Sequence, residues 1–143
     1  MTSAGLPPEL ASLIQNDEQA AETVLDYLIH KHGGVGLLLR VLSRRPNQFV
    51  PYTLYSHQAY EAPAHIDPKT AQFAAVAASA ALMCDHCLIA HMRAAQSKGA
   101  SLDEILDVVL VAGAIAQSST LAVAFRKFLQ LEGKRDESQA ADL

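Results

Sequence analysis

Two long stretches of the chain, residues 70–84 and 108–125, contain no charged residue. Apolar runs of this length either span a membrane or form helices that protein covers on nearly every side. The first stretch is mostly alanine, and the second has a polar segment at residues 117–120, so neither suits a lipid environment. We therefore predict two buried helices. Since a chain of 143 residues has little other surface to cover them, we expect a partner subunit to contribute.

Helical periodicity extends through the rest of the chain. Apolar residues recur at spacings of three and four, and no segment shows the strict alternation of a half-buried strand. Glycines, prolines and capping residues divide this pattern into separate helices. The expected ranges are residues 9–30, 37–42, 48–61, 68–82, 84–98, 101–114 and 118–131. The pattern predicts an all-α helical bundle.

A length of 143 residues corresponds to a single domain. Within it we distinguish an N-terminal helical arm at residues 1–60, a core region at residues 61–133 and a polar tail at residues 134–143. The formal net charge is −4 and no block of basic residues is present, so we expect no nucleic-acid partner. The first ten residues lack the pattern of a secretion signal, so we expect a cytoplasmic protein without a membrane partner.

The most informative segment is Cys84-Asp85-His86-Cys87, followed by His91. A Cys-x-x-Cys pair brings two sulfur atoms within bonding distance across one helical turn, so it can alternate between dithiol and disulfide. Cys87 and His91 are four residues apart and therefore share one helix face. The imidazole can remove a thiol proton or stabilise the thiolate, and a position in the first helical turn also favours the thiolate. Protonated His86 would help, whereas the Asp85 carboxylate would oppose it.

Two other interpretations of these residues remain open. The cysteines and the histidine can simply pack in the core, as buried free cysteines commonly do. Alternatively, Cys84, Cys87 and His91 can supply three ligands of a zinc ion, with His57, His65 or another residue as a fourth. A thioredoxin fold is not expected, because the βαβ pattern that flanks its Cys-x-x-Cys is missing.

Several motifs around the cysteines resemble the alkylhydroperoxidase D and carboxymuconolactone decarboxylase superfamily. The matching motifs are His65-Ile66-Asp67-Pro68-Lys69-Thr70, Cys84-Asp85-His86-Cys87, His91 and Gly99-Ala100-Ser101, followed by the apolar helix after Glu104. The resemblance implies an all-helical fold that assembles as a homo-oligomer, either a trimer or a hexamer. Since the decarboxylase branch lacks the cysteine pair, the chain is similar to the redox branch.

The resemblance also implies a role for each site residue. Cys87, the second cysteine, is the one expected to attack a hydroperoxide and become a sulfenic acid. Cys84 would donate a proton and then close the disulfide. His91 would belong to a proton relay, and His86 occupies a position where the redox branch can carry a histidine.

One position departs from the family pattern. The relay of the family begins with a glutamate twelve residues before the first cysteine, and here this position is Gln72. An amide can form a hydrogen bond but cannot act as a base. We therefore expect the Gln72 amide to form a hydrogen bond towards His91 or a bridging water, without the negative charge that would raise the basicity of the imidazole. Glu61 is the nearest preceding carboxylate.

These residues and the resemblance together predict a thiol-dependent oxidoreductase that reduces hydroperoxides or disulfides. An external dithiol would restore the reduced pair, and no cofactor or metal is expected. Two alternatives from other classes remain, a decarboxylase-like enzyme acting on a lactone and a non-enzymatic protein that senses zinc or redox state. The expected catalytic residues are Cys84, Cys87, His91, Gln72 and His86.

Overall fold

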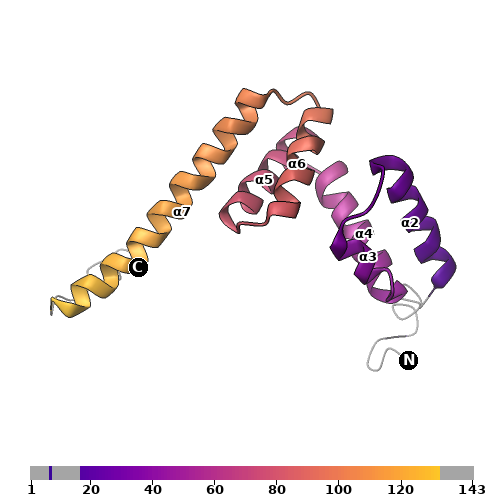
Figure 1. The fold of residues 1–143 in the computed structure, drawn as a ribbon, viewed down its shortest axis with the longest axis horizontal. Coiled ribbons are helices and arrows are strands. Elements are labelled where there is room, and N and C mark those ends of the chain that lie inside the picture. The colour runs from indigo at the N-terminus through magenta and orange to yellow at the C-terminus, as the bar shows by residue number, and fades with distance from the viewer. Residues whose placement is uncertain (1–6, 8–16, 133–143) are drawn as a thin grey trace. The chain divides into compact units, whose positions relative to one another are not determined.

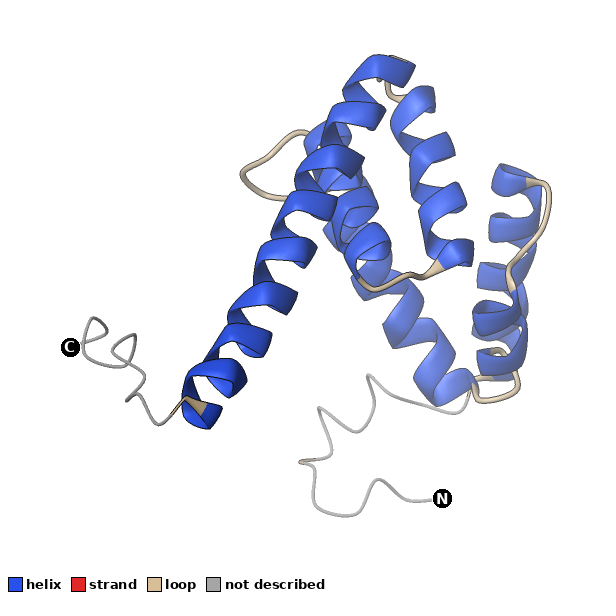
Figure 2. Ribbon diagram, turned by 60° about the vertical axis from the view of Figure 1, so that its left-hand side comes forward, coloured by secondary structure: helices blue, strands red, loops and turns tan. Residues whose placement is uncertain are grey.

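Every regular element among the described residues is an α-helix (Figure 2), so the expected all-α fold is confirmed. The structure is a computed structural model that describes residue 7 and residues 17–132. It divides the chain into two compact units, Met1–Pro68 and Lys69–Leu143. The helices are α2 (Glu18–His32), α3 (Leu37–Leu42), α4 (Pro46–Glu61), α5 (Pro68–Ala81), α6 (Asp85–Ser97) and α7 (Leu102–Leu131).

The first unit contains α2, α3 and α4 (Figure 1). The side chain of Asp17 caps α2, because it accepts a hydrogen bond of 2.9 Å from the backbone N–H of Ala20. The helix ends at Gly33, whose φ of +74° is a left-handed conformation that glycine adopts without steric cost. α4 packs against both α2 and α3 and buries Phe49 completely. Burial of this aromatic side chain stabilises the unit.

The core of the second unit lies where α5, α6 and the beginning of α7 meet. Ala95 of α6 and Ile105 of α7 are buried together with Ala100, which lies in the turn between these helices. Phe73 of α5 and Met92 of α6 pack against this cluster. The small side chains of Ala95 and Ala100 allow α6 and the start of α7 to approach closely, and Phe73 of α5 packs against this contact.

Polar contacts fix the start of α7 against α5. Ser101 and Glu104 form the expected capping box, in which each side chain accepts a hydrogen bond from the other residue's backbone N–H, at 3.0 and 2.8 Å. The Glu104 carboxylate also accepts a hydrogen bond of 2.9 Å from Lys69 Nζ. Both hydrogen bonds hold the pKa of Glu104 below its usual range. The one from the Ser101 backbone has the largest effect, and the one from Lys69 has the next largest.

The last two expected helices are one continuous helix, α7, so the break predicted at residues 115–117 is wrong. Residues 115–117 contain no glycine or proline, and Gly113 lies within the helix without interrupting it. The hydroxyls of Ser118 and Thr120 donate to carbonyls within the helix, those of Ile115 and Ala116, both at 2.9 Å. These polar side chains are therefore satisfied by the helix itself and do not terminate it.

The continuous first helix expected at residues 9–30 is wrong, because Asp17 is extended and caps α2, which begins at Glu18 and ends at His32. The remaining expected helices are present with small shifts at their ends. α3 has the predicted bounds, and α4 begins at Pro46, two residues before the expected start at residue 48. Proline suits the first position of a helix because its missing N–H has no partner to lose there. Residues 9–16 of the first expected helix and the polar tail at residues 134–143 lie outside the described residues.

Little of α7 is covered by the part of the chain that the structure describes. Ile105 and Ala112 are its buried residues, and every residue from 117 to 128 is exposed. Figure 1 shows this part of α7 continuing past α5 and α6. By length and composition alone, α7 is the one helix in the described ranges that could cross a membrane. Its polar segment at residues 117–120 favours a protein environment, and the described residues do not supply the burial that the sequence predicts.

We propose that further copies of the chain cover α7 in a homo-oligomer, either a trimer or a hexamer. Leu110 and Phe125 expose 60% and 58% of their surface. Phe125→Glu would place a charge in the apolar interface, so it should lower the mass that light scattering measures at micromolar concentration. The control Gln130→Glu adds the same charge at an exposed polar position and should leave the mass unchanged. A monomeric mass for the unaltered protein would contradict the proposal.

The lowered pKa of Glu104 predicts a pH-dependent stability. Its carboxylate stabilises the fold above the unfolded value near 4.5, and this contribution is lost as the pH falls through the lower folded value. Glu104→Gln keeps the capping geometry but removes the charge, so it should slightly lower the unfolding temperature near neutral pH and not in strong acid. Circular dichroism during heating would measure this. Asp107→Asn, a charge removal elsewhere on α7, should not show this pH dependence.

Candidate active site

The turn between α5 and α6 positions the cysteines. At the end of α5, the Met83 N–H donates to the Ala80 carbonyl at 3.1 Å and the Cys84 N–H donates to the Ser79 carbonyl at 2.9 Å. This is a Schellman termination, and Met83 occupies its left-handed position with a φ of +53°. Cys84 is also the N-cap of α6. The backbone of Cys84 is therefore fixed by the end of one helix and the start of the next.

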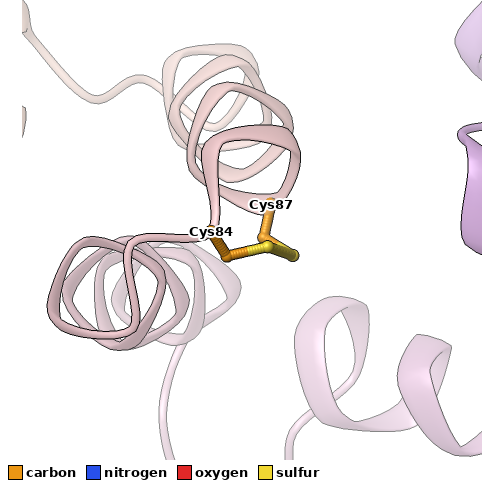
Figure 3. The surroundings of a disulfide bond; sticks show 2 residues. All are labelled: Cys84 and Cys87. Carbon is orange, nitrogen blue, oxygen red and sulfur yellow. A yellow bond between two sulfur atoms is a disulfide. The ribbon is translucent and has the colours of Figure 1, made fainter.

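A disulfide joins Cys84 to Cys87 across the first turn of α6 (Figure 3). Their Cα atoms are 5.4 Å apart, within the usual range for bridged cysteines. The two residues differ in exposure, since Cys84 is half-buried whereas Cys87 is exposed. A reagent that approaches from solution therefore reaches Cys87 more easily.

Gln72 lies beside His91, and the hydrogen bond expected between them is confirmed. Gln72 on α5 is only 1% exposed, and its Oε1 lies 2.8 Å from Nδ1 of the half-buried His91 on α6. Because an amide oxygen can only accept, Nδ1 carries the proton in this pair. In the neutral ring, Nε2 then carries the lone pair and is the atom that can take up a proton. The contact thus selects one tautomer of His91.

The chemical nature of this partner also affects the charge of His91. A carboxylate at the same place would attract the protonated imidazole, whereas a neutral amide favours it much less. Residues 70–84, which include α5 after Lys69, contribute no other charge to this side of α6. The arrangement consists of a redox-capable cysteine pair and an oriented imidazole on one helix.

Asp85 and His86 occupy the first two positions of α6, and both are exposed. They lie between the two cysteines in sequence, so their charges act close to the sulfur atoms. Glu61, the nearest preceding carboxylate, forms an ion pair with Lys31 in the first unit, with 3.8 Å between Oε2 and Nζ. The roles predicted for His86 and the other site residues remain predictions.

A zinc site of the kind that the sequence allows requires four ligands close to one another. Within residue 7 and residues 17–132, no three side chains of His, Cys, Asp or Glu lie close enough together to hold a metal ion. Cys84, Cys87 and His91, which all belong to the second unit, do not form such a group.

The left-handed conformation of Met83 is one determinant of the site that the sequence did not reveal. Glycine or asparagine usually signals such a position, and methionine gives no comparable signal. A left-handed backbone costs a residue with a Cβ atom about 1–2 kcal/mol. The contacts of α5 and α6 therefore have to offset this cost to keep Cys84 at the start of α6.

Comparisons with known proteins found one matching family model and a solved structure with a similar fold. A model of the carboxymuconolactone decarboxylase family matches residues 51–130, more than half of the chain, including α5, α6 and both cysteines. The crystal structure of the alkylhydroperoxidase AhpD core from Rhodospirillum rubrum ATCC 11170 is similar, with a TM-score of 0.65 and 23% sequence identity. The similarity covers 88% of this chain and 91% of that chain. A comparison with curated proteins finds no match.

Proposed function

The chain belongs to the carboxymuconolactone decarboxylase family, and from this premise we propose that it is a thiol-dependent oxidoreductase that reduces hydroperoxides. The observation that carries the proposal is the Cys84–Cys87 pair, whose exposed member lies four residues before the oriented His91. The alkylhydroperoxidase core with a similar fold supports a hydroperoxide as the substrate class. Disulfides are a second class that the same sulfur chemistry can reduce.

In the oxidative step, the Cys87 thiolate attacks one oxygen of the O–O bond. This oxygen stays on sulfur as a sulfenic acid, and the other oxygen leaves as an alcohol after it takes up a proton. His91 is suited to accept the Cys87 proton at Nε2, because Gln72 holds the proton on Nδ1. The Cys84 thiol then attacks the sulfenic sulfur, releasing water and forming the disulfide.

An external dithiol is proposed to restore the reduced pair. It transfers two electrons to the Cys84–Cys87 disulfide and becomes a disulfide itself, so the protein returns to its starting state. We propose that this cycle takes place in the cytoplasm and uses no bound organic cofactor. Cys84 and Cys87 carry the electrons, whereas His91 moves a proton and Gln72 orients His91.

The cysteine roles predict different outcomes for the two single variants. Cys87→Ser should abolish dithiol-dependent consumption of an alkyl hydroperoxide, because it removes the attacking sulfur. Cys84→Ser should stop turnover but leave a sulfenic acid on Cys87, which a dimedone adduct detected by mass spectrometry would reveal. His91→Asn should slow turnover about 10²–10⁴-fold if it removes general-base help.

One control and two contrary results complete the test of the proposed function. His57→Asn, a control at an exposed histidine of α4, should retain full activity. Normal turnover in both cysteine variants would show that the thiol mechanism is wrong. Turnover of a lactone by the unaltered protein and by both cysteine variants would instead favour a decarboxylase-like activity.

Gln72→Glu tests whether the amide limits the reaction. The new carboxylate should raise the pKa of His91 by about one unit or more, which an NMR titration of the imidazole would measure. Better general-base help should then speed the reaction with hydroperoxide near neutral pH, recovering part of a range of about 10²–10⁴-fold. If the folded variant shows the original His91 titration and the original rate, residue 72 has no part in the relay.

A further inference from the structure

The two sulfur atoms of the disulfide occupy unequal positions on α6. Cys84 is the N-cap and is half-buried, whereas Cys87 lies at the third helical position and is exposed. Thiol–disulfide exchange requires the attacking sulfur to reach one of the two bonded sulfurs, and the other sulfur then leaves as a thiolate. Exposure therefore favours attack at Cys87, with Cys84 as the leaving group.

The start of α6 suits a negative charge on Cys84. The first hydrogen bond of the helix runs from the Leu88 N–H to the Cys84 carbonyl at 2.8 Å. The N–H groups of Asp85, His86 and Cys87 therefore lie in the first turn, before the hydrogen bonds within the helix begin. No side chain caps this end of α6. A thiolate released at the N-cap lies at the positive end of the helix dipole and can accept from these N–H groups. A lower thiol pKa makes a better leaving group.

We infer that the reductant of this protein enters at Cys87 and that Cys84 is the thiolate released, so that the mixed disulfide forms on Cys87. This inference rests on the redox cycle of the proposed function. A thiolate of the reductant attacks the Cys87 sulfur, a new S–S bond forms, and the Cys84–Cys87 bond breaks with its electron pair on Cys84. The second thiol of the dithiol then attacks the reductant's own sulfur, releasing Cys87 as a thiolate and leaving the reductant oxidised.

The charged and titratable groups near the two sulfurs come from α6. Asp85 opposes a thiolate on Cys84, and His86 favours it when protonated. His91 is held by Gln72 of α5, and residues 70–84 add no charge from that helix. Lys69 and Glu104 lie at the opposite end of α5 from the cysteines and are paired with each other at 2.9 Å. Removing the charge of Asp85 therefore tests how the surroundings stabilise a thiolate on Cys84.

Glutathione can map the attacked sulfur in the full-length, oxidised protein. A brief exposure to glutathione, acid quenching and alkylation of the freed thiol would leave one sulfur with glutathione and the other with the alkyl group. Both cysteines lie in the tryptic peptide of residues 70–93, and fragment ions between them distinguish the two isomers. We expect glutathione on Cys87 in excess by about fivefold, the bias of a helix-terminus interaction of about 1 kcal/mol. An equal distribution, or an excess on Cys84, would overturn the inference.

A second measurement addresses the leaving group directly. In Cys87→Ala, the rate of Cys84 alkylation against pH should give a thiol pKa below the ordinary value of about 8.5. Adding Asp85→Asn should lower it further, whereas Asp107→Asn, which removes the same charge from α7, should not change it. An ordinary or raised Cys84 pKa that does not respond to Asp85→Asn would contradict the inference.

The two hypotheses fail in different ways. If glutathione is found on Cys84 while hydroperoxide turnover still needs both cysteines, this inference is wrong and the proposed function stands. If glutathione is found on Cys87 but no hydroperoxide is consumed, the order of sulfur attack stands and the proposed substrate is wrong.

Discussion

The termination of α5 is the constraint on which the site depends. Two backbone hydrogen bonds, from Met83 to Ala80 and from Cys84 to Ser79, close this helix and leave Cys84 as the N-cap of α6. Cys84 therefore lies at the positive end of α6, one helical turn before Cys87. The left-handed Met83 adds strain, which the burial of α5 and α6 side chains has to offset. This tight turn thus fixes where the cysteine pair begins relative to the end of α5.

Gln72 links the packing of α5 to the chemistry on α6. Its side chain is almost completely buried, so its hydrogen bond to His91 is shielded from competition with water. The amide fixes the tautomer of the imidazole but adds no charge. Orientation and electrostatic activation, which a carboxylate would supply together, are therefore separated in this chain. This separation makes residue 72 informative about how much of the rate depends on each.

The two parts of α7 differ in how far the described residues bury them. Its first turns pack with α6 through Ile105, while its later part is apolar and exposed in the single chain. Exposed apolar surface of this length is unfavourable in water, which is the reason for proposing that further copies of the chain cover this helix. The hydroxyls of Ser118 and Thr120 bond within the helix, which keeps this surface continuous across its polar segment.

The sequence by itself determined the helical class, most helix ends and the residues of the candidate site. Local rules suffice there, because caps such as Ser101 with Glu104 and spacings such as Cys84 to Cys87 act within one or two turns. The resemblance to a family pointed to Gln72 as the partner of His91, and the structure confirmed the contact. Only the tertiary structure decided that α7 is unbroken, that Met83 is left-handed and that Cys87 is the more exposed cysteine. These features depend on how neighbouring helices compete for space and hydrogen bonds, which no local pattern of residues specifies.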